Sequence, residues 1–527
     1  MSDGHQYGGP QGRQRRQQAN RRRDPGHRAG RFSCSGEGSG WRLPNPCVCY
    51  DRSKVTVRFE GTASSIAVRP SLARSTRGAL HAVQIRQRAV TPPGPQRLDR
   101  ARGVLSTPGA EEVSHRLSAL DAWAFILPAV SFIELTIIGQ LIVSEILALA
   151  MLPWLWGARD RPALPRWFVV LWAGWLISQI LTDVVVGSAF ADYARGWAAI
   201  VFTFTDFAAL LVLVSTPKRA RLFALGLAVG GVLGYVFAPN PYAATDPWKW
   251  AFAFPVGLAL AAGLSGPTGA RSRWLVVGAF IAFGIVNLAL GFRNMGGVSL
   301  LTAGYLFLNV LEGRSETASN RSMLRALVGL SFLAVAGWGT LQIYDIAASQ
   351  GLLGPDVQAK YVYESGGLGV LVGGRSEVLV SSQAVIDSPI LGHGSWAKDF
   401  AYADLLQGRL SELGYEMGGG SSDIGLIPSH SYLMQSWVWA GLLGGVFWLA
   451  ILAIAVWLLA NLYVFRVELM PLFVFSTTLL LWNTAFSPYG AGARIQATYA
   501  IALCLLGLRL ARPTLAPVAY PSGADLR

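Results

Sequence analysis

Charged residues are scarce in this sequence. They make up 14% of the 527 residues, whereas hydrophobic residues make up 52% and the mean hydropathy is +0.40. A soluble globular chain carries about 25% charged residues, so this chain has too few to cover a surface that faces water. The composition therefore excludes a soluble single-domain enzyme and favours a protein embedded in a membrane.

Cysteine and histidine are also scarce, which limits the possible metal sites. The chain has four cysteines and six histidines. Cys47-Val-Cys49 could be combined with His5 or His27 into a zinc site, but paired C-x-x-C spacing is absent. The H-E-x-x-H pattern of zinc proteases and the phosphate-binding G-x-x-x-x-G-K-[ST] pattern are absent as well. We therefore expect neither a metal nor a nucleotide cofactor.

Positive charge is concentrated at the start of the chain. The net charge is +14, and residues 1–118 hold 21 Lys and Arg against 8 Asp and Glu, whereas residues 119–527 hold 23 against 22. Residues 1–118 show neither apolar periodicity nor a signal-peptide pattern. We expect a disordered Arg-rich leader, either a solvated segment from an upstream start or an arm for nucleic acid or anionic lipid. The solvated segment is favoured, with no nucleic-acid partner.

Long apolar runs fill the rest of the chain. Most are about 17–25 residues long, which an α-helix needs to cross about 30 Å of hydrocarbon. The sequence therefore predicts an all-α polytopic membrane domain over 119–512, with about 12 transmembrane helices, followed by a tail over 513–527. The expected spans are 122–138, 140–156, 167–187, 196–215, 220–238, 248–265, 274–290, 296–312, 324–343, 432–461, 468–486 and 494–510.

The positions of the basic residues predict the orientation of the domain. If the N-terminus is cytoplasmic, most Arg and Lys residues outside the leader fall in cytoplasmic connections, as the positive-inside rule requires. Both termini are then cytoplasmic. The long connection 344–431, between the ninth and tenth spans, becomes one large extracytoplasmic loop.

A few basic residues lie on the outer side. Arg195, Arg293 and Arg494 are at or near expected helix ends, where a phosphate could approach. Arginine suits that contact because its planar guanidinium can bond two phosphate oxygens at once. Lys249 lies between two tryptophans and is interpreted as a surface charge that extends toward water.

Acidic residues also occur within the first four expected spans. They are Glu134, Glu145, Asp183 and Asp206. Charged side chains in a membrane usually face the protein interior and often serve function. Asp206 is the deepest of the four within its span, so it is a candidate for proton transfer.

Two stretches of the outer loop carry distinctive residues. The first runs from Arg375 through an expected amphipathic helix to Asp387-Ser-Pro-Ile-Leu-Gly-His-Gly394. The second begins at His430-Ser-Tyr-Leu and continues into the tenth span at Gly441-Leu-Leu-Gly444. The second stretch therefore places a histidine at the membrane interface. His393 is interpreted as a turn residue.

At these residues the chain resembles the O-antigen ligase and O-antigen polymerase family of bacterial envelope enzymes. In that family an arginine, a helix and a D-x-P-hydrophobic-x-G-x-G turn precede a His-Asn-x-x-Leu segment and a Gly-Leu-x-Gly span. Gly291-Phe-Arg-Asn is similar to the family's Ser-Arg-Gly stretch. Ser431 stands where the family usually has asparagine.

The resemblance implies a glycosyltransferase of the bacterial inner (plasma) membrane. Such an enzyme moves or polymerises an oligosaccharide from an undecaprenyl-diphosphate-linked donor onto a hydroxyl of a glycan or lipid acceptor, without a metal or nucleotide. It implies that His430 takes the proton of the acceptor and that the diphosphate is bound by Arg195, Arg293, Arg375 and Arg494. Both the ligase and the polymerase remain open.

Other classes of membrane protein remain alternatives. A transporter or lipid-linked oligosaccharide flippase would use membrane acids such as Asp183 and Asp206, although the two similar halves common in transporters are not evident. A peptidoglycan-type polymerase shares the lipid-linked donor. A receptor or scaffold would bind through the acidic outer loop, since 344–431 holds 10 Asp and Glu against 4 Lys and Arg.

Overall fold

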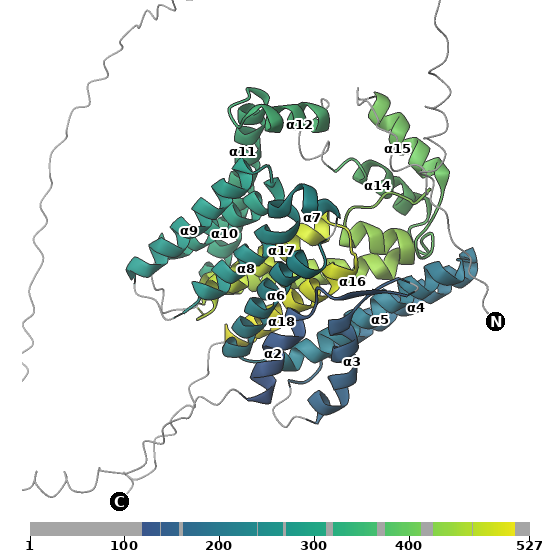
Figure 1. Cartoon of the computed structure of the whole chain (residues 1–527), viewed down its shortest axis with the longest axis horizontal. Coiled ribbons are helices and arrows are strands. Elements are labelled where there is room, and N and C mark those ends of the chain that lie inside the picture. Colours follow the sequence, from purple (N-terminus) through teal and green to yellow (C-terminus); the bar gives the residue numbers. More distant parts are fainter. Residues whose placement is uncertain are drawn as a thin grey trace, which may run out of the picture. The chain divides into compact units, whose positions relative to one another are not determined.

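The computed structural model describes most of the expected membrane domain (Figure 1). The described residues are 118–137, 139–157, 162–239, 241–266, 270–311, 320–365, 375–412, 425–465 and 467–511. The expected leader, apart from Ser118, and the tail 513–527 lie outside them. Ser118 caps the first described helix, because its hydroxyl accepts a hydrogen bond from Asp121 N (3.1 Å).

Helices make up nearly all of the regular structure in the described ranges. The elements are α2 (Ala119–Ala129), β1 (Glu134–Thr136), β2 (Gln140–Ile142), α3 (Val143–Trp156), α4 (Arg166–Val186), α5 (Phe190–Leu213), α6 (Pro217–Phe237), α7 (Pro241–Thr245), η3 (Trp248–Phe252), α8 (Ala253–Gly263), α9 (Ala270–Ala289), α10 (Arg293–Leu311), α11 (Asn320–Ser349), α12 (Pro355–Ser365), α14 (Val378–Asp387), α15 (Phe400–Glu412), α16 (Tyr432–Val464), α17 (Met470–Phe486) and α18 (Ala491–Leu510).

Seven of the described helices are long and apolar enough to cross a membrane. They are α4, α5, α6, α9, α10, α16 and α18, with α9 qualifying over Ser272–Ala289. The prediction of a helical, multi-pass membrane protein is therefore confirmed. The count of about twelve spans stays a prediction.

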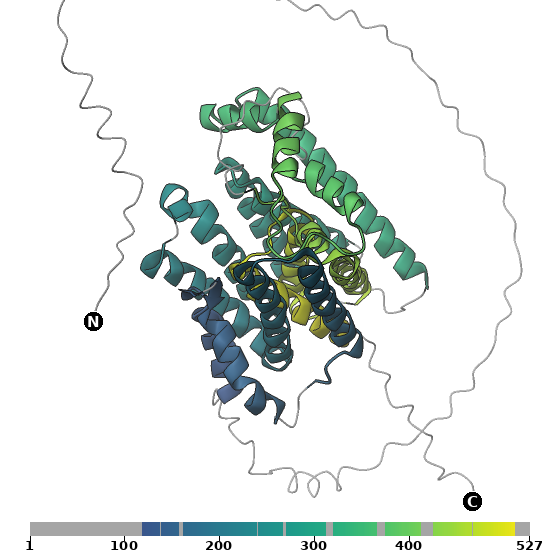
Figure 2. The same ribbon diagram turned by 90° about the vertical axis from the view of Figure 1, so that its right-hand side faces the viewer.

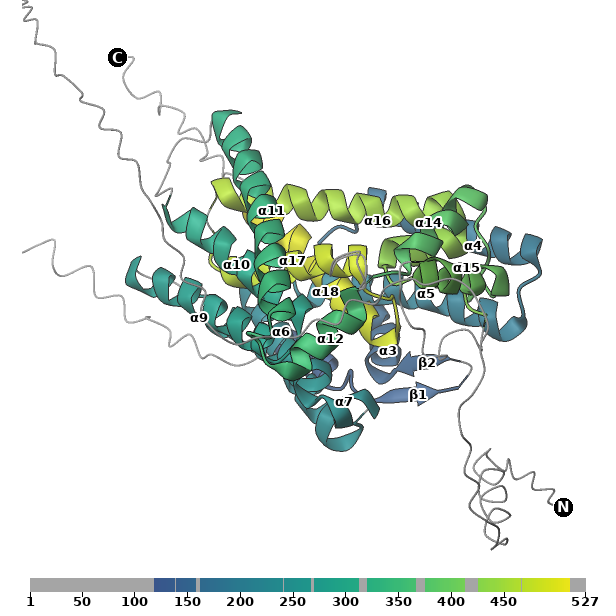
Figure 3. The same cartoon turned by 90° about the horizontal axis from the view of Figure 1, so that it is seen from above.

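The first two expected spans differ from the helices observed. The helices there have 11 and 14 residues, and the strands β1 and β2 between them form an antiparallel pair, with Glu134 opposite Ile142 and Thr136 opposite Gln140 (Figure 3). A helix of 14 residues is only about 21 Å long. Three of the nine residues from Glu134 to Ile142 are isoleucine, which favours strands, so an apolar run here does not mean a continuous helix.

Aromatic side chains fill the centre of the helix bundle. Phe168 on α4 stacks on Phe207 of α5, and it meets Phe447 of α16 edge to face. Trp448 of α16 is fully buried and donates its indole N–H to Ser436 Oγ (2.8 Å). The indole polar group is therefore satisfied within the apolar core.

The helices of the outer loop share one end of the bundle, which we call the outer-loop end. Figures 1 and 2 show α12, α14 and α15 beyond the ends of the longer helices. At this end the start of α10 meets the end of α11, since Arg293 Cζ lies 5.7 Å from the centroid of the Tyr344 ring. The end of α4 meets the outer loop there as well, through Asp183 and Ser395.

Basic residues hold other connections together away from the outer loop. Lys218, near the start of α6, forms an ion pair with Asp121 of α2 (2.6 Å), and Arg219 lies 3.7 Å from the same carboxylate. Arg509, near the end of α18, donates to the carbonyl of Ser215 (3.2 Å). These contacts join segments that the charge pattern assigns to one side of the membrane.

A turn of the outer loop inserts into a break in α16. Gly441 has a φ of 65° and a ψ of −153°, which interrupts the helix. The turn formed by residues 389–394 supplies replacement hydrogen bonds: Leu442 N donates to the carbonyl of Ile390 (3.1 Å), and His393 N donates to the carbonyl of Val438 (2.7 Å). The break is therefore tolerated because the exposed backbone groups find partners within the protein.

Helix α4 completes the contacts at this break. Ser178 Oγ donates to the carbonyl of Ala440 (2.6 Å), and the Thr182 hydroxyl donates to the carbonyl of Leu391. Gly392 has a φ of 84°, and a Cβ there would lie 2.5 Å from Gly441 N. The two glycine-containing motifs of the sequence are thus packed against each other.

Asp183 fastens the outer loop to α4 and α5. Its carboxylate is 3% exposed and accepts hydrogen bonds from Ser395 N (2.6 Å), Ser395 Oγ (2.7 Å) and Trp197 Nε1 (2.8 Å). Ser188 Oγ (2.7 Å) and Gln179 Nε2 (3.2 Å) donate to it as well. A buried carboxylate that accepts this many hydrogen bonds holds the segments that donate them in place, so its role here is structural.

Replacing Asp183 with alanine is expected to destabilise the fold by about 2–3 kcal/mol, because several buried donors lose their acceptor. Thermal melting measures the loss, and limited proteolysis should show earlier cleavage within 375–412. Asp387→Ala is the matched control, since that carboxylate is exposed. If both variants melt alike, Asp183 does not fasten the loop.

Candidate functional site

His430 lies directly before α16 and faces an acidic residue. Its Nδ1 is 3.3 Å from Glu377 Oε1, and both side chains are partly exposed. Ser431 caps α16 by accepting a hydrogen bond from Met434 N (3.1 Å), and its hydroxyl donates to the carbonyl of Thr484 (2.8 Å). The backbone that carries His430 is therefore anchored, while the ring stays open to solvent.

Three basic side chains from three separate segments lie close to one another, and one of them, Arg375, lies close to Glu377. Arg375 precedes α14 by three residues, Arg293 begins α10, and Lys249 belongs to the π-helical turn η3. Each lies within electrostatic range of the other two, and Glu377 lies in range of Arg375. Burial, assisted by the charge of Arg293, lowers the pKa of Arg375 below its ordinary value.

We call these five residues the His430 cluster: Lys249, Arg293, Arg375, Glu377 and His430. Its three cations outnumber its one carboxylate. Asp345 of α11 and Asp246 add negative charge at the edge. With these two aspartates the region holds three cations and three carboxylates, so an anionic group would be attracted by the cations themselves rather than by a net charge. Partial burial strengthens that attraction because water screens it less.

The structure thus brings together three of the five predicted site residues, His430, Arg293 and Arg375. It adds Glu377, which sequence reasoning missed although it lies two residues after Arg375 in the same stretch. Lys249 was interpreted as a surface charge, and its Nζ does lie 4.9 Å from the centroid of the Trp250 ring. Its π-helical turn is a signal that sequence periodicity does not show; such turns are frequent at functional sites.

Arg195 lies in a different set of contacts. Its guanidinium is 5.5 Å from the centroid of the Trp396 ring and 3.9 Å from Asp192, which also pairs with Lys398 (2.7 Å). Trp396 has a φ of 52°, which is uncommon for a residue other than glycine. Arg195 therefore belongs to a contact between α5 and the outer loop.

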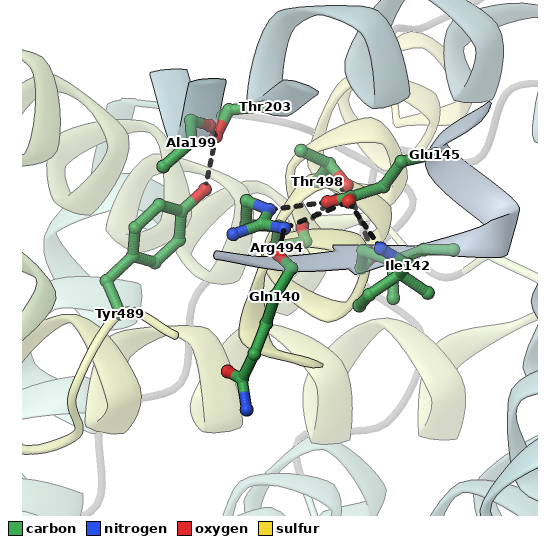
Figure 4. Close-up of polar contacts among 9 residues, drawn as sticks. Gln140, Ile142, Glu145, Ala199, Thr203, Tyr489, Arg494 and Thr498 are labelled. Carbon is green, nitrogen blue, oxygen red and sulfur yellow. Dashed lines mark hydrogen bonds and ion pairs between the residues drawn. The ribbon is translucent and has the colours of Figure 1, made fainter. Parts of the chain in front are cut away.

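Arg494 is buried inside the bundle (Figure 4). Its guanidinium pairs with Glu145, with Nη2 2.9 Å from Oε2 and Nε bonded to Oε1, and Nη2 also donates to the carbonyl of Gln140 (3.0 Å). Only 6% of the residue is exposed. Because Glu145 already neutralises this guanidinium, we do not retain Arg494 as a diphosphate contact.

The turn motif of the outer loop forms local hydrogen bonds. Tyr402 Oη (2.7 Å) and Gln383 Nε2 (2.8 Å) donate to Asp387, and they lower the pKa of that carboxyl below its ordinary value. His393 Nε2 is 2.8 Å from the carbonyl of Ala384. The prediction that His393 serves the turn agrees with this contact.

Metal binding has no candidate in the part of the chain that the structure describes. Within the described ranges, no group of three or more His, Cys, Asp and Glu side chains is arranged to hold a metal ion. Cys47 and Cys49, considered as zinc ligands, lie outside those ranges.

No protein-family model, curated protein or solved structure matches the chain. The assignment of function therefore depends on the chemistry of the residues themselves.

Proposed function

We propose that the protein is an integral membrane glycosyltransferase. It transfers or polymerises an oligosaccharide from an undecaprenyl-diphosphate-linked donor onto an acceptor hydroxyl in the synthesis of cell-envelope polysaccharide. The observation that carries the proposal is the His430 cluster, in which one histidine lies beside a carboxylate and three cations at the outer-loop end of the bundle. The proposal keeps the O-antigen ligase-like assignment, with ligase and polymerase both open.

The cations suit a diphosphate leaving group. When the sugar leaves the lipid, negative charge grows on the diphosphate oxygens, and fixed cations stabilise that charge more in the transition state than before it. Arg293 and Arg375 can each present two N–H groups to phosphate, and Lys249 adds a compact charge. Their partial burial increases the effect.

His430 suits the acceptor side of the reaction. The acceptor hydroxyl must lose its proton as it attacks the sugar carbon, and histidine is the side chain best matched to that task near neutral pH. Glu377 at 3.3 Å orients the ring and stabilises the imidazolium that forms. The proton thus moves from the acceptor oxygen to His430.

Contacts between segments support the proposed orientation, in which both termini are cytoplasmic. The end of α4 meets the outer loop, and the start of α10 meets the end of α11. The basic connections near Lys218 and Arg509 meet each other elsewhere. These connections between successive helices thus lie alternately at the outer-loop end and among the basic connections. This alternation fits a chain that crosses the membrane about twelve times, with the short helices α2 and α3 as the first two spans.

Removing a cation of the cluster is expected to weaken transfer. Arg375→Ala should reduce kcat/KM by about tenfold to 100-fold, which is the loss expected when one charge-assisted contact to phosphate is removed. Arg375→Lys keeps the charge, so its kcat/KM should fall less. Transfer from a lipid-diphosphate-linked oligosaccharide by the purified protein measures this. Arg409→Ala in the same loop is the matched control, and equal activity of both alanine variants would contradict the phosphate role.

A transporter or flippase is the second candidate, favoured by the buried charges Glu145, Asp206 and Arg494. Glycan analysis of a deletion strain separates the two. A transferase defect leaves lipid-linked oligosaccharide on the outer face of the membrane, whereas a flippase defect leaves it on the cytoplasmic face.

A further inference from the structure

Three charged side chains meet inside the bundle, apart from the His430 cluster. Asp206 of α5 is 2% exposed, Glu145 of α3 is 0% exposed and Arg494 of α18 is 6% exposed. Helix α3, which carries Glu145, and helix α18, which carries Arg494, both pack against α5. Glu145 and Arg494 are also the charged groups that act electrostatically on Asp206. We call these three residues the buried triad.

Within the buried triad, Arg494 is already committed to Glu145. It contacts both carboxylate oxygens of Glu145, and Oε2 also accepts a hydrogen bond from Ile142 N (3.0 Å) (Figure 4). The remaining bond of the guanidinium goes to the carbonyl of Gln140. The hairpin and α3 thus hold Glu145 and Arg494 together as a neutral pair.

Asp206 has no such partner. Its Oδ2 is fully buried and has no hydrogen-bond partner among the described residues. The nearby hydroxyl of Tyr489 is hydrogen-bonded with Thr203 (2.6 Å).

The other charged groups on the helices around α5 are engaged elsewhere. Asp183 of α4 accepts bonds from the outer loop, and Asp121 of α2 pairs with Lys218 and Arg219 of α6. At the start of α5 itself, Asp192 pairs with Lys398. In the described part of the chain, Arg494 is therefore the cation that faces Asp206.

The balance of charge then determines whether the Asp206 carboxyl group is protonated. Two ionised carboxylates and one guanidinium would leave a net negative charge in the bundle, away from water, which is strongly unfavourable. Binding one proton to Asp206 makes its carboxyl group neutral, which removes that net charge from the bundle. A neutral carboxyl group tolerates burial of Oδ2 better than an ionised one does. We propose that the buried triad is a proton-binding site in which Asp206 is a neutral carboxylic acid at neutral pH.

The two carboxyl groups of the buried triad can exchange the proton. If the proton passes from Asp206 to Glu145, Arg494 loses its anionic partner, and the ionised Asp206 becomes the carboxylate available to pair with it. One proton then resides on either carboxyl, and Arg494 pairs with the other. The proposal does not depend on the glycosyltransferase assignment, because it concerns different residues in a different part of the bundle.

Labelling by dicyclohexylcarbodiimide tests the proposal, since this apolar reagent adds to protonated carboxyls in membrane proteins. The full-length protein in detergent is treated near pH 7, and peptides are analysed by mass spectrometry. We expect an adduct on Asp206 and none on Asp183. In Glu145→Gln, Arg494 is free to pair with Asp206, so the adduct should fall by about tenfold or more, the effect of a nearby opposite charge on the protonated fraction.

Thermal melting of two variants gives an independent measurement that reagent access does not affect. Asp206→Asn is a neutral isostere, so it should melt within a few degrees of the wild type, whereas Glu145→Gln should melt below it because Arg494 loses both of its bonds to Glu145 and must rearrange to pair with Asp206. Equal destabilisation by both variants would show that Asp206 is ionised and would overturn the proposal. Protection of Asp206 from the reagent by sodium, and not by potassium, would overturn it in favour of a metal-cation site.

Discussion

Replacing His430 with alanine is expected to reduce glycan transfer by about 10²- to 10⁴-fold, the usual contribution of a general base. The loss should fall on kcat, because the acceptor proton is transferred in the reaction step, and donor binding by Arg293 and Arg375 should persist. The purified protein, a lipid-diphosphate-linked oligosaccharide and an acceptor glycan provide the assay. Glycan analysis of a deletion strain complemented with the variant provides the test in the cell.

His393→Ala is the matched control, because His393 is the other histidine in the described ranges and contacts the carbonyl of Ala384 in the turn. It should keep its transfer rate per folded molecule, although its melting temperature falls. Full restoration of glycan by His430→Ala would exclude His430 as the base. Equal loss in both histidine variants would point to a structural role of the outer loop.

Replacing Gly441 with alanine is expected to cost about 3–5 kcal/mol, enough to prevent accumulation of folded protein. The added Cβ would overlap the carbonyl of Ile390, and the φ of 65° is unfavourable for any residue with a side chain. The backbone atoms at the break have no free space to move into, since Gly392 also approaches it closely. Yield of monodisperse protein and its melting temperature measure the effect.

Gly278 of α9 is the matched control for Gly441. A Cβ at Gly278 would meet no atom within 4 Å, and the residue is in a regular helix. Gly278→Ala should therefore be neutral or stabilise the helix by up to about 1 kcal/mol. If Gly441→Ala accumulates and melts like Gly278→Ala, the inserted turn does not depend on the glycine.

Apolar run length predicted much of the membrane domain. The expected spans 167–187, 196–215 and 220–238 correspond to α4, α5 and α6 because each run is bounded by glycine, proline or charge. Run length failed at 134–142, where a hairpin rich in isoleucine and leucine is as apolar as a helix. An apolar run that forms a hairpin differs from one that forms a helix only in the pairing of its two strands, which composition does not encode.

The candidate site was predictable where its residues share a motif. Arg375 and His430 stand out because the outer loop has few basic residues and two histidines. The role of Arg494 was not predictable, since its partner Glu145 is 349 residues away in the chain. A lone arginine near a helix end looks the same in sequence whether it faces a phosphate or a buried carboxylate.

The break at Gly441 divides α16 into two parts with different supports. The outer part, Tyr432–Ala440, is about 14 Å long and is held by the 389–394 turn at one end and by Ser431 at the other. The backbone position of His430 is therefore set jointly by the 389–394 turn, by α17 through Thr484 and by the inner part of α16 through Trp448. The ring of His430 has a separate support, because its described partner, Glu377, belongs to the outer loop. A substrate that displaced Glu377 would thus change the orientation of the imidazole ring while the backbone of His430 stayed in place.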